Sequence, residues 1–390
     1  MSSDGMSAKN ATADAVGTAA DADPSGELRS EAAVSPDSSL MTNESGGGLA
    51  GFGRRVVKIQ SFQILLVLIA IFVVFSVMAP DTFPTWANMR LVIQNVSILA
   101  VLGVGMTYVI ITSGIDLSIG SVLVFSGVVA AKVMQSMGGD GWGTAIVGIL
   151  VSIVCGIAWG VLNGALIARA KVPPLIVTLG TLSGALGLAQ VITGGVDIRA
   201  VPAVLATNIG YGNIPGTTIP TISVIALVFV VVFGIILHKT KFGLYTYAVG
   251  SNEESARRVG VKVDRHLILI YALSGCLAGV AGILSLAQYS TTAIAGQSNT
   301  SLAVIAAVVI GGTSLFGGVG TIFGTVVGLF IPAILQNGFV ITGVQPFWQQ
   351  VAIGTILIVA VYIDQRRRAA ASRAAKTGTR SLAHLFRRSA

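Results

Sequence analysis

The chain has 390 residues, of which 53% are hydrophobic and only 10% are charged. A soluble domain usually carries roughly 25% charged residues, so this composition excludes a soluble globular protein. The formal net charge of +8 does not indicate nucleic-acid binding, because the basic residues stand in short clusters beside apolar segments, where they contact anionic lipid. The stretch from Leu267 to Ile363 has no Asp, Glu, Lys, Arg or His, so it must lie in lipid.

Residues 1–50 differ in composition from the rest of the chain. They are rich in Ser, Ala, Gly and Asp, contain no aromatic residue and have more acidic than basic side chains. Such a composition is typical of disordered segments, and the stretch lacks the basic-then-apolar pattern of a signal peptide. We therefore expect a disordered acidic cytoplasmic tail over residues 1–55, a membrane domain over 56–365 and a basic cytoplasmic tail over 366–390.

Long apolar runs between turn residues and charges predict the membrane helices. A bilayer core of about 30 Å requires roughly 20 apolar residues per helix, which divides the chain into about ten spans. The predicted spans are 62–79, 91–112, 117–134, 144–168, 174–193, 219–237, 267–288, 300–316, 318–336 and 349–363. Glycine is so dense between 300 and 336 that a broken or re-entrant helix is an open alternative there. The sequence thus predicts an all-α integral membrane protein.

Clusters of basic residues indicate how these spans are oriented. Lys and Arg in short loops stay preferentially in the cytoplasm. With the spans given above, four basic groups fall on the same side of the membrane: Arg54 to Lys58, Arg169 with Lys171, His238 to His266, and Arg366 to Arg368. Both termini are then expected in the cytoplasm.

A single acid, Asp116, stands in the segment TSGIDLSIGS, where the chain turns between the second and third predicted spans. At the start of a helix, a short carboxylate can accept hydrogen bonds from unpaired N–H groups and meet the positive end of the helix dipole. Asp116 is therefore expected either to cap the third span or to line or gate the exit of a permeation path. The sequence leaves both interpretations open.

Uncharged polar side chains inside the spans are further candidates for such a path. Most Ser and Thr residues are expected to bond to their own helix backbone. Asn and Gln are costlier to bury, so they favour contacts between helices or a route for a neutral, hydroxyl-rich solute. The predicted path or gate comprises Asp116, Ser118, Asn95, Asn163, Gln190, Gln288 and Asn337.

Glycines recur every four residues in two predicted spans. Gly156, Gly160 and Gly164 share one face of the fourth span, and Gly275 and Gly279 repeat the spacing in the seventh. Small residues at this spacing let helix backbones approach closely. We therefore expect these glycines to pack helices within one subunit.

Two segments of the chain resemble each other. NGALIARAKVPPLIVTLGT (163–181) and NGFVITGVQPFWQQVAIGT (337–355) share an Asn-Gly, a following proline and a Gly-Thr at nearly matched positions. An odd number of predicted spans separates them, so the two copies would cross the membrane in opposite directions. This pattern indicates inverted repeats, the second to fifth spans against the seventh to tenth, which are common in transporters.

The predicted loop from His238 to Leu267 is both long and charged, and it contains a short helix of its own. A capping side chain, two acids in the first turn, two arginines in the last turn and a terminating glycine all complement the helix dipole. These residues are Ser251 or Asn252 as the cap, then Glu253, Glu254, Arg257, Arg258 and Gly260. The helix is either a solvated connector between two bundles or a docking knob for a cytoplasmic partner.

Residue patterns for catalysis and metal binding are absent from the sequence. It has no G-x-x-x-x-G-K-[ST] phosphate loop and no His/Cys cluster with metal-ligand spacing. The chain is therefore not expected to be an enzyme or to hold a cofactor or a metal. The spans also lack the ionisable groups of a proton-coupled carrier, so either energy comes from another subunit or the path is passive.

Four motifs occur along the membrane domain: TSGIDLSIGS, AVGSNEESARRVGVKVDRH, YALSGCLAGVAGIL and AVVIGGTSLFGGVGTIFGTVVG. In this order they resemble the ribose/xylose-type permease family of bacterial ABC sugar importers. The resemblance covers about residues 60–365, and the two tails lie outside it.

The resemblance implies a ten-span permease with the type II fold of the cobalamin importer, working as a homodimer in the bacterial inner membrane. It implies import of a monosaccharide such as ribose or xylose. The other partners would be an ABC-type ATPase subunit and an extracytoplasmic sugar-binding protein, and the coupling helix would be Ser251 to Gly260. Asp116 and its neighbours match the family's signature.

The competing interpretation is a stand-alone facilitator or a secondary carrier for a small neutral polar solute. The missing coupling ions argue against a carrier, whereas a facilitator stays open.

Overall fold

The computed structural model describes residues 60–366, apart from residues 200, 296–298, 346, 349, 356, 357, 360, 363 and 364. The chain divides into two units, Met1–Gly51 and Phe52–Ala390, and all described residues belong to the second. They form helices and loops, with one isolated β-bridge between Asn213 and Pro220. The described part of the chain is therefore all-α, as predicted. The expected tails lie outside the described residues, except for Arg366.

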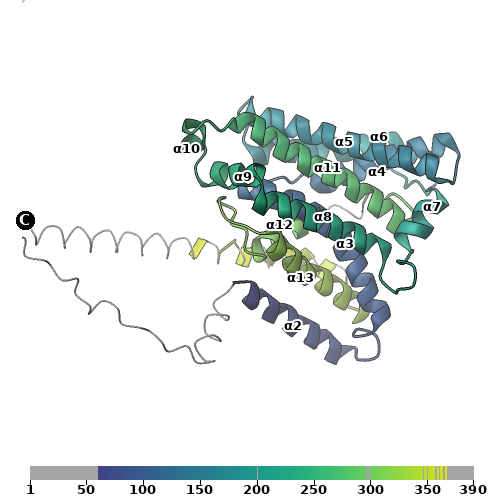
Figure 1. Cartoon of the computed structure of the whole chain (residues 1–390). Coiled ribbons are helices and arrows are strands. Elements are labelled where there is room, and N and C mark those ends of the chain that lie inside the picture. The colour runs from purple at the N-terminus through teal and green to yellow at the C-terminus, as the bar shows by residue number, and fades with distance from the viewer. Residues whose placement is uncertain are drawn as a thin grey trace, which may run out of the picture. The chain divides into compact units, whose positions relative to one another are not determined.

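Helices of very different lengths follow one another along the chain (Figure 1). Two long helices of 27 residues each, α5 and α11, form its longest elements. The bounds are α2 Gln60–Met78, α3 Trp86–Ile111, α4 Ile119–Met137, α5 Trp142–Ala168, α6 Pro174–Thr193, α7 Ala203–Leu205 with the π-turn η2 Ala206–Gly210, α8 Thr221–Lys239, α9 Lys241–Ser251, α10 Glu253–Arg258, α11 Val263–Tyr289, α12 Thr300–Ile310 and α13 Ile322–Ile341.

Among the described residues, seven helices are long and apolar enough to cross a membrane: α3, α4, α5, α6, α8, α11 and α13. Two shorter apolar helices, Ile64–Met78 within α2 and Thr300–Ile310, accompany them. The last predicted span, 349–363, includes residues that the structure does not describe. The chain is thus a multi-pass helical membrane protein.

The glycine-dense region departs from its predicted boundaries. Spans were expected at 300–316 and 318–336, but α12 ends at Ile310 and α13 begins at Ile322 and continues to Ile341. Three glycines between them, at positions 312, 317 and 318, have φ values of +98°, +81° and +75°, which a right-handed helix cannot contain. The two predicted boundaries were therefore wrong, because the glycines form a loop between a short helix and a long one.

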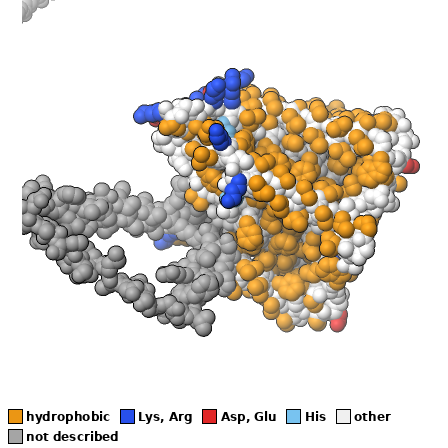
Figure 2. All heavy atoms as spheres, in the orientation of Figure 1, with side chains coloured by type: hydrophobic (Ala, Val, Ile, Leu, Met, Phe, Trp, Pro, Cys, Tyr) orange, Lys and Arg blue, Asp and Glu red, His pale blue; other side chains and the backbone are white. Residues whose placement is uncertain are grey.

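Side chains on the outer faces of the long helices are apolar. Leu150 and Val154 of α5 and Leu227 and Val228 of α8 are each more than half exposed. In Figure 2, hydrophobic side chains cover most of the visible face, whereas Lys and Arg gather beside α9 and α10. Such a surface suits contact with lipid along the helices and with water at their ends. We call the end that carries α9, α10 and the loops 112–118, 169–173 and 311–321 the α10 end.

Helices α5 and α11 touch through their backbones. A Cβ atom added to Gly156 would lie 2.1 Å from the carbonyl oxygen of Gly275, and one added to Gly160 would lie 2.2 Å from that of Tyr271. At Gly279 the corresponding distance, to the carbonyl oxygen of Ser152, is 2.4 Å. Side chains at these glycines would force the helices apart. The close contact fixes α11 against α5 along much of their length.

At the end of the molecule opposite the α10 end, two loops are joined by a set of hydrogen bonds. The amide of Thr292 donates to the carbonyl of Ile198 at 3.0 Å, and the Ile198 amide donates to the Thr292 hydroxyl at 2.8 Å. The carboxylate of Asp197 accepts from the Ile294 amide at 3.1 Å and from the Thr292 hydroxyl at 3.0 Å. These bonds tie the segment after α6 to the segment before α12.

Candidate functional site

Helix α10 is a six-residue helix with a complete set of terminal interactions. The Asn252 side chain accepts a hydrogen bond from the Ser255 amide at 2.7 Å, so Asn252 rather than Ser251 is the cap. Ser251 is the last residue of α9, and Gly260, with φ of +89°, follows the helix end. Local capping therefore stabilises a helix that is too short to persist by its backbone hydrogen bonds alone.

Two ion pairs lie along α10, and they differ in how far their side chains are exposed. Glu254 pairs with Arg258, and their side chains are 74% and 77% exposed. Glu253 pairs with Arg257 at 2.9 Å, and these side chains are less exposed. The exposed pair, together with Val259 at 79% exposure, forms an outward surface of mixed charge and apolar character. Such a surface is suited to contact with another protein.

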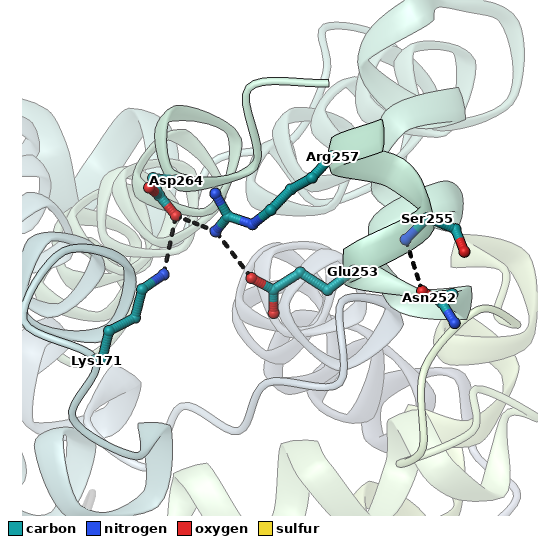
Figure 3. A network of polar contacts seen from close by, with 6 residues as sticks. All are labelled: Lys171, Asn252, Glu253, Ser255, Arg257 and Asp264. Carbon is teal, nitrogen blue, oxygen red and sulfur yellow. Dashed lines mark hydrogen bonds and ion pairs between the residues drawn. The ribbon is translucent and has the colours of Figure 1, made fainter. Parts of the chain in front are cut away.

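The inward pair continues into a chain of ionic contacts that leaves α10 (Figure 3). Arg257 also donates to the carboxylate of Asp264, in the first turn of α11. Asp264 in turn accepts from Lys171 at 3.0 Å, and Lys171 lies in the loop between α5 and α6. Asp264 thus joins three separate elements through one carboxylate. Neither Lys171 nor Asp264 was among the site residues predicted from the sequence.

Helix α9 connects α10 with two further loops. The hydroxyl of Tyr247 donates to the carbonyl of Gly320 at 2.7 Å. At Gly250, an added Cβ would lie 1.7 Å from the carbonyl oxygen of Ile111 and 2.8 Å from the amide nitrogen of Gly318. The backbones of α9, the end of α3 and the α12–α13 loop therefore meet at Gly250.

The same two loops are bonded to each other. The amide of Gly318 donates to the carbonyl of Ile111 at 2.9 Å, and the hydroxyl of Ser113 donates to the carbonyl of Phe316 at 2.8 Å. Ser113 has φ of +62°, an uncommon conformation for a residue with a side chain. The turn after α3 is therefore held in place by the α12–α13 loop.

Asp116 lies at the centre of a buried polar cluster and is only 2% exposed. Its Oδ1 accepts from the amide of Ser118 at 3.0 Å and from the Ser118 hydroxyl at 2.6 Å, while Oδ2 accepts from the Ser274 hydroxyl at 3.1 Å. Asn163 donates to the Ser118 hydroxyl at 2.9 Å. The cluster joins the α3–α4 loop to α5 and α11.

Asp116 closes the turn that leads into α4 and does not cap the helix itself, because α4 begins at Ile119 with Ser118 as its N-cap residue, and both bonds of Asp116 Oδ1 come from Ser118. Burial raises the pKa of its carboxyl group, and the hydrogen bonds from Ser118 and Ser274 partly offset that rise. The carboxylate is enclosed by protein in this conformation, so it does not line an open path.

The seven predicted path residues do not converge on one place. Asp116, Ser118 and Asn163 lie together near the α10 end. The others lie elsewhere: Asn95 accepts from Tyr289 at 3.2 Å, Asn337 exchanges hydrogen bonds with Asn88 at 2.8 and 2.9 Å, Gln288 is buried near the end of α11, and Gln190 is exposed on α6. The structure therefore groups three of these residues and places the other four outside that cluster.

A cavity of about 260 Å³ opens between the α3–α4 loop, the α5–α6 loop and α10. Its lining includes Gly114, Lys171, Glu253 and Tyr271. The hydroxyl of Tyr271 is buried and has no hydrogen-bond partner among the described residues. A Cβ on Gly114 would lie 2.6 Å from that hydroxyl, so glycine makes room for the tyrosine. The cavity leaves space beneath α10 rather than close packing.

The described residues contain no group of three or more His, Cys, Asp or Glu side chains that could hold a metal ion. The site consists of ionic contacts and hydrogen bonds that join α10 and α9 to other elements. A short, charged, outward-facing helix is connected by α9 and by ionic contacts to three loops that join long apolar helices. These features define a multi-pass membrane protein whose short charged helix is joined to the loops between its spans.

Comparison with known proteins assigns the chain more closely. Residues 88–361 match the family described as "Branched-chain amino acid transport system / permease component". The ribose import permease protein RbsC of Escherichia coli (strain K12) is 35% identical over 84% of this chain and 100% of its own length. The RbsC of Bacillus subtilis (strain 168) is 38% identical over 82% and 96%, and the fructose import permease protein FrcC of Rhizobium meliloti is 35% identical over 77% and 84%.

The chain belongs to the ribose/xylose-type permease family of ABC sugar importers, which confirms the resemblance found in its motifs. No solved structure gives a significant match to the chain.

Proposed function

We propose that this protein is the membrane-spanning subunit of an ATP-binding cassette importer and forms the translocation path for a monosaccharide such as ribose or xylose. The observation that carries the proposal is identity of 35–38% to ribose import permeases over more than four fifths of the chain. A neutral, polyhydroxylated substrate also agrees with the amides and hydroxyls inside the helices, such as Asn95, Asn163 and Gln288.

The proposed membrane domain, residues 56–365, crosses the bilayer ten times with the type II fold of the cobalamin importer. The seven long apolar helices, the two shorter ones and the helical residues between 347 and 366 support this count. An inverted repeat is supported by the location of its two copies at opposite ends of the molecule. Lys171 in the first copy contacts Asp264 at the α10 end, whereas Asn337 in the second contacts Asn88 at the start of α3.

The α10 end faces the cytoplasm in this proposal, as do both termini. Lys and Arg gather there, in agreement with the preference of basic loops for that side. An ABC-type ATPase subunit docks on the outward surface of α10, formed by Glu254, Arg258 and Val259. An extracytoplasmic sugar-binding protein delivers the sugar at the other end, and a second copy of the permease completes the path. Anionic lipids contact the basic clusters.

Mechanically, closure of the ATPase dimer displaces α10, and α9 passes the displacement to the loops 112–118 and 311–321. The close approach at Gly250 and the Tyr247–Gly320 hydrogen bond make these contacts stiff. The loops then shift the ends of α3, α4, α12 and α13, which alternates access to the path. Asp116, Ser118 and Asn163 stand where this movement enters the bundle.

The first test is uptake of radiolabelled ribose and xylose in a strain that lacks its own importers but carries this chain with an ATPase and a sugar-binding protein. Glu254→Arg reverses a charge on the exposed surface of α10 and should reduce uptake at least tenfold. The amount of permease in the membrane should stay unchanged, and the ATPase should no longer co-purify. Glu254→Asp, which keeps the charge, serves as the matched control and should retain uptake.

Two results would contradict the proposal. Uptake that persists without the ATPase would identify the chain as a stand-alone facilitator or carrier. Uptake of a branched-chain amino acid instead of a sugar would reassign the substrate, in line with the printed description of the family.

A further inference from the structure

Asp264 occupies an unusual position among the charges of the α10 end. It lies in the first turn of α11, and its Oδ1 accepts from Arg257 of α10 and from Lys171 of the α5–α6 loop. Arg257 also bonds Glu253, so four charged side chains form one continuous chain (Figure 3). One carboxylate is thus shared between the helix proposed to receive the ATPase and the loop that begins α6.

The α5–α6 loop is built to pass a displacement on to α6. Lys171 has φ of +57°, a conformation in which a side chain is strained. Pro173 and Pro174 follow, with Pro174 as the first residue of α6, so the backbone between Lys171 and the helix has little freedom. A shift of the Lys171 side chain is therefore transmitted to the start of α6 rather than absorbed by the loop.

Helix α6 is also free to respond. It packs on α4 and α5, while several of its apolar side chains, including Leu175, Ile176 and Leu179, are largely exposed. Beneath α10, the cavity of about 260 Å³ is lined by Lys171 and Glu253, so these two elements face each other across a space. The ionic contacts through Asp264 bridge that space.

We propose that Asp264 is a positioning residue that couples α10 to the start of α6, as a third connection beside the two made by α9. The inference rests on the proposed function, since it assumes that the ATPase moves α10. When α10 moves, Arg257 draws the carboxylate of Asp264, and Lys171 follows. Without the shared carboxylate, the ATPase still docks and hydrolyses ATP, but α6 no longer moves in step with the loops 112–118 and 311–321.

The linkage should also be sensitive to salt, because the side chains of the bridge are between 39% and 59% exposed. Ion pairs with this exposure are screened by added electrolyte, whereas the hydrogen bonds and backbone contacts of α9 are not. Salt dependence therefore separates an ionic linkage from general damage to the fold.

The test uses the complete transporter, with this chain, its ATPase and its sugar-binding protein reconstituted in liposomes. The quantity measured is the number of sugar molecules imported per ATP hydrolysed, together with co-purification of the ATPase. Asp264→Asn removes the charge with little change in shape, and Lys171→Gln does the same at the other end. Asp264→Glu and Lys171→Arg keep the charges, and Arg265→Gln removes a neighbouring exposed charge outside the bridge.

Asp264→Asn and Lys171→Gln should each retain the ATPase and lower the sugar-to-ATP ratio roughly two- to fivefold, the range expected from an exposed ion pair. The charge-keeping variants and Arg265→Gln should stay near wild type. Raising the salt concentration should lower the wild-type ratio by a larger factor than that of Asp264→Asn, because both also carry the exposed Glu254–Arg258 pair that salt screens.

An unchanged ratio in Asp264→Asn would overturn the inference and leave the proposed function intact. Loss of the ATPase from that variant would also overturn it, because Asp264 would then act in docking. A wild-type complex that imports no sugar would contradict the proposed function itself.

Discussion

Asp116 receives its hydrogen bonds from neutral groups. The donors are the amide and hydroxyl of Ser118 and the hydroxyl of Ser274, and burial raises the pKa of the carboxyl group. A group whose folded-state pKa is raised contributes stability at low pH and loses that contribution as the pH rises through its folded pKa. Ionisation of Asp116 therefore lowers the stability of the fold. Its oxygen atoms stabilise the fold by accepting hydrogen bonds from Ser118 and Ser274.

Asp116→Asn should separate the hydrogen-bonding role of this side chain from a gating role. The amide keeps an oxygen acceptor for Ser118 and removes the buried charge, so the thermal unfolding midpoint in detergent should equal or exceed that of wild type near pH 7. The difference should shrink as the pH falls through the raised pKa of the buried carboxyl group, and it should vanish below the ordinary aspartate pKa of about 4, where the unfolded chain is protonated as well. Asp116→Leu, which leaves Ser118 and Ser274 without an acceptor, should lose about 1–3 kcal/mol. A stable Asn variant without uptake would instead indicate that the charge itself serves transport.

The position of Asp116 shows what can be predicted about a single residue. A hydrogen-bonding role for Asp116 at the start of the third span could be predicted, because the Ser118 amide that it binds lies two residues away. Its other partners could not, since Ser274 lies 158 residues away in α11, and the supporting Asn163 lies 45 residues from Ser118 in α5. Contacts between helices are set by packing, for which the local pattern carries no signal.

At the scale of elements, the α5–α11 contact depends on glycines that could be recognised by their spacing. Gly156→Ala would place a methyl group 2.1 Å from the carbonyl oxygen of Gly275, and that backbone atom cannot move aside without separating the helices. We expect a loss of about 2 kcal/mol or more, as for overpacked cores. Gly234→Ala in α8 is the matched control, because nothing lies within 4 Å of its added Cβ. Thermal unfolding of both variants in detergent measures the difference, and equal midpoints would contradict this account.

The limits of one short helix, α10, could be predicted from the sequence, whereas those of another, α12, could not. The limits of α10 could be predicted from Asn252, its paired charges and Gly260, because terminal interactions are local. Those of α12 could not, because the stretch from 300 to 336 has no charged residue and several glycines, and the one side-chain cap in it, Thr321, starts α13. Where a glycine adopts positive φ depends on the neighbouring loops, which approach from other parts of the chain.

For the whole molecule, composition and motif order were sufficient to predict the membrane class and the family. The meeting of three loops at the α10 end was not predictable, because it depends on how the helices fold back on one another. For the same reason, the polar residues grouped as one path separate into different regions, with Asn163 near one end and Asn337 near the other.

Helix α12 has 11 residues and is about 16 Å long, roughly half the thickness of a bilayer core. The segment before it therefore contains backbone groups that no helix can satisfy, and Ile198 and Asp197 accept the hydrogen bonds of Thr292 and Ile294. Thr292 and Ile294 are buried, so each lost hydrogen-bond partner would cost about 1–3 kcal/mol. Although Thr292 and Ile294 lie in a loop, their amide hydrogens should exchange with deuterium as slowly as those inside α11. Asp197→Ala should accelerate exchange only at Ile294, whose amide bonds the Asp197 carboxylate. Rapid exchange at both amides in the wild type would contradict this expectation. These bonds hold the segment after α6 against the segment after α11, so the two loops should behave as one ordered unit.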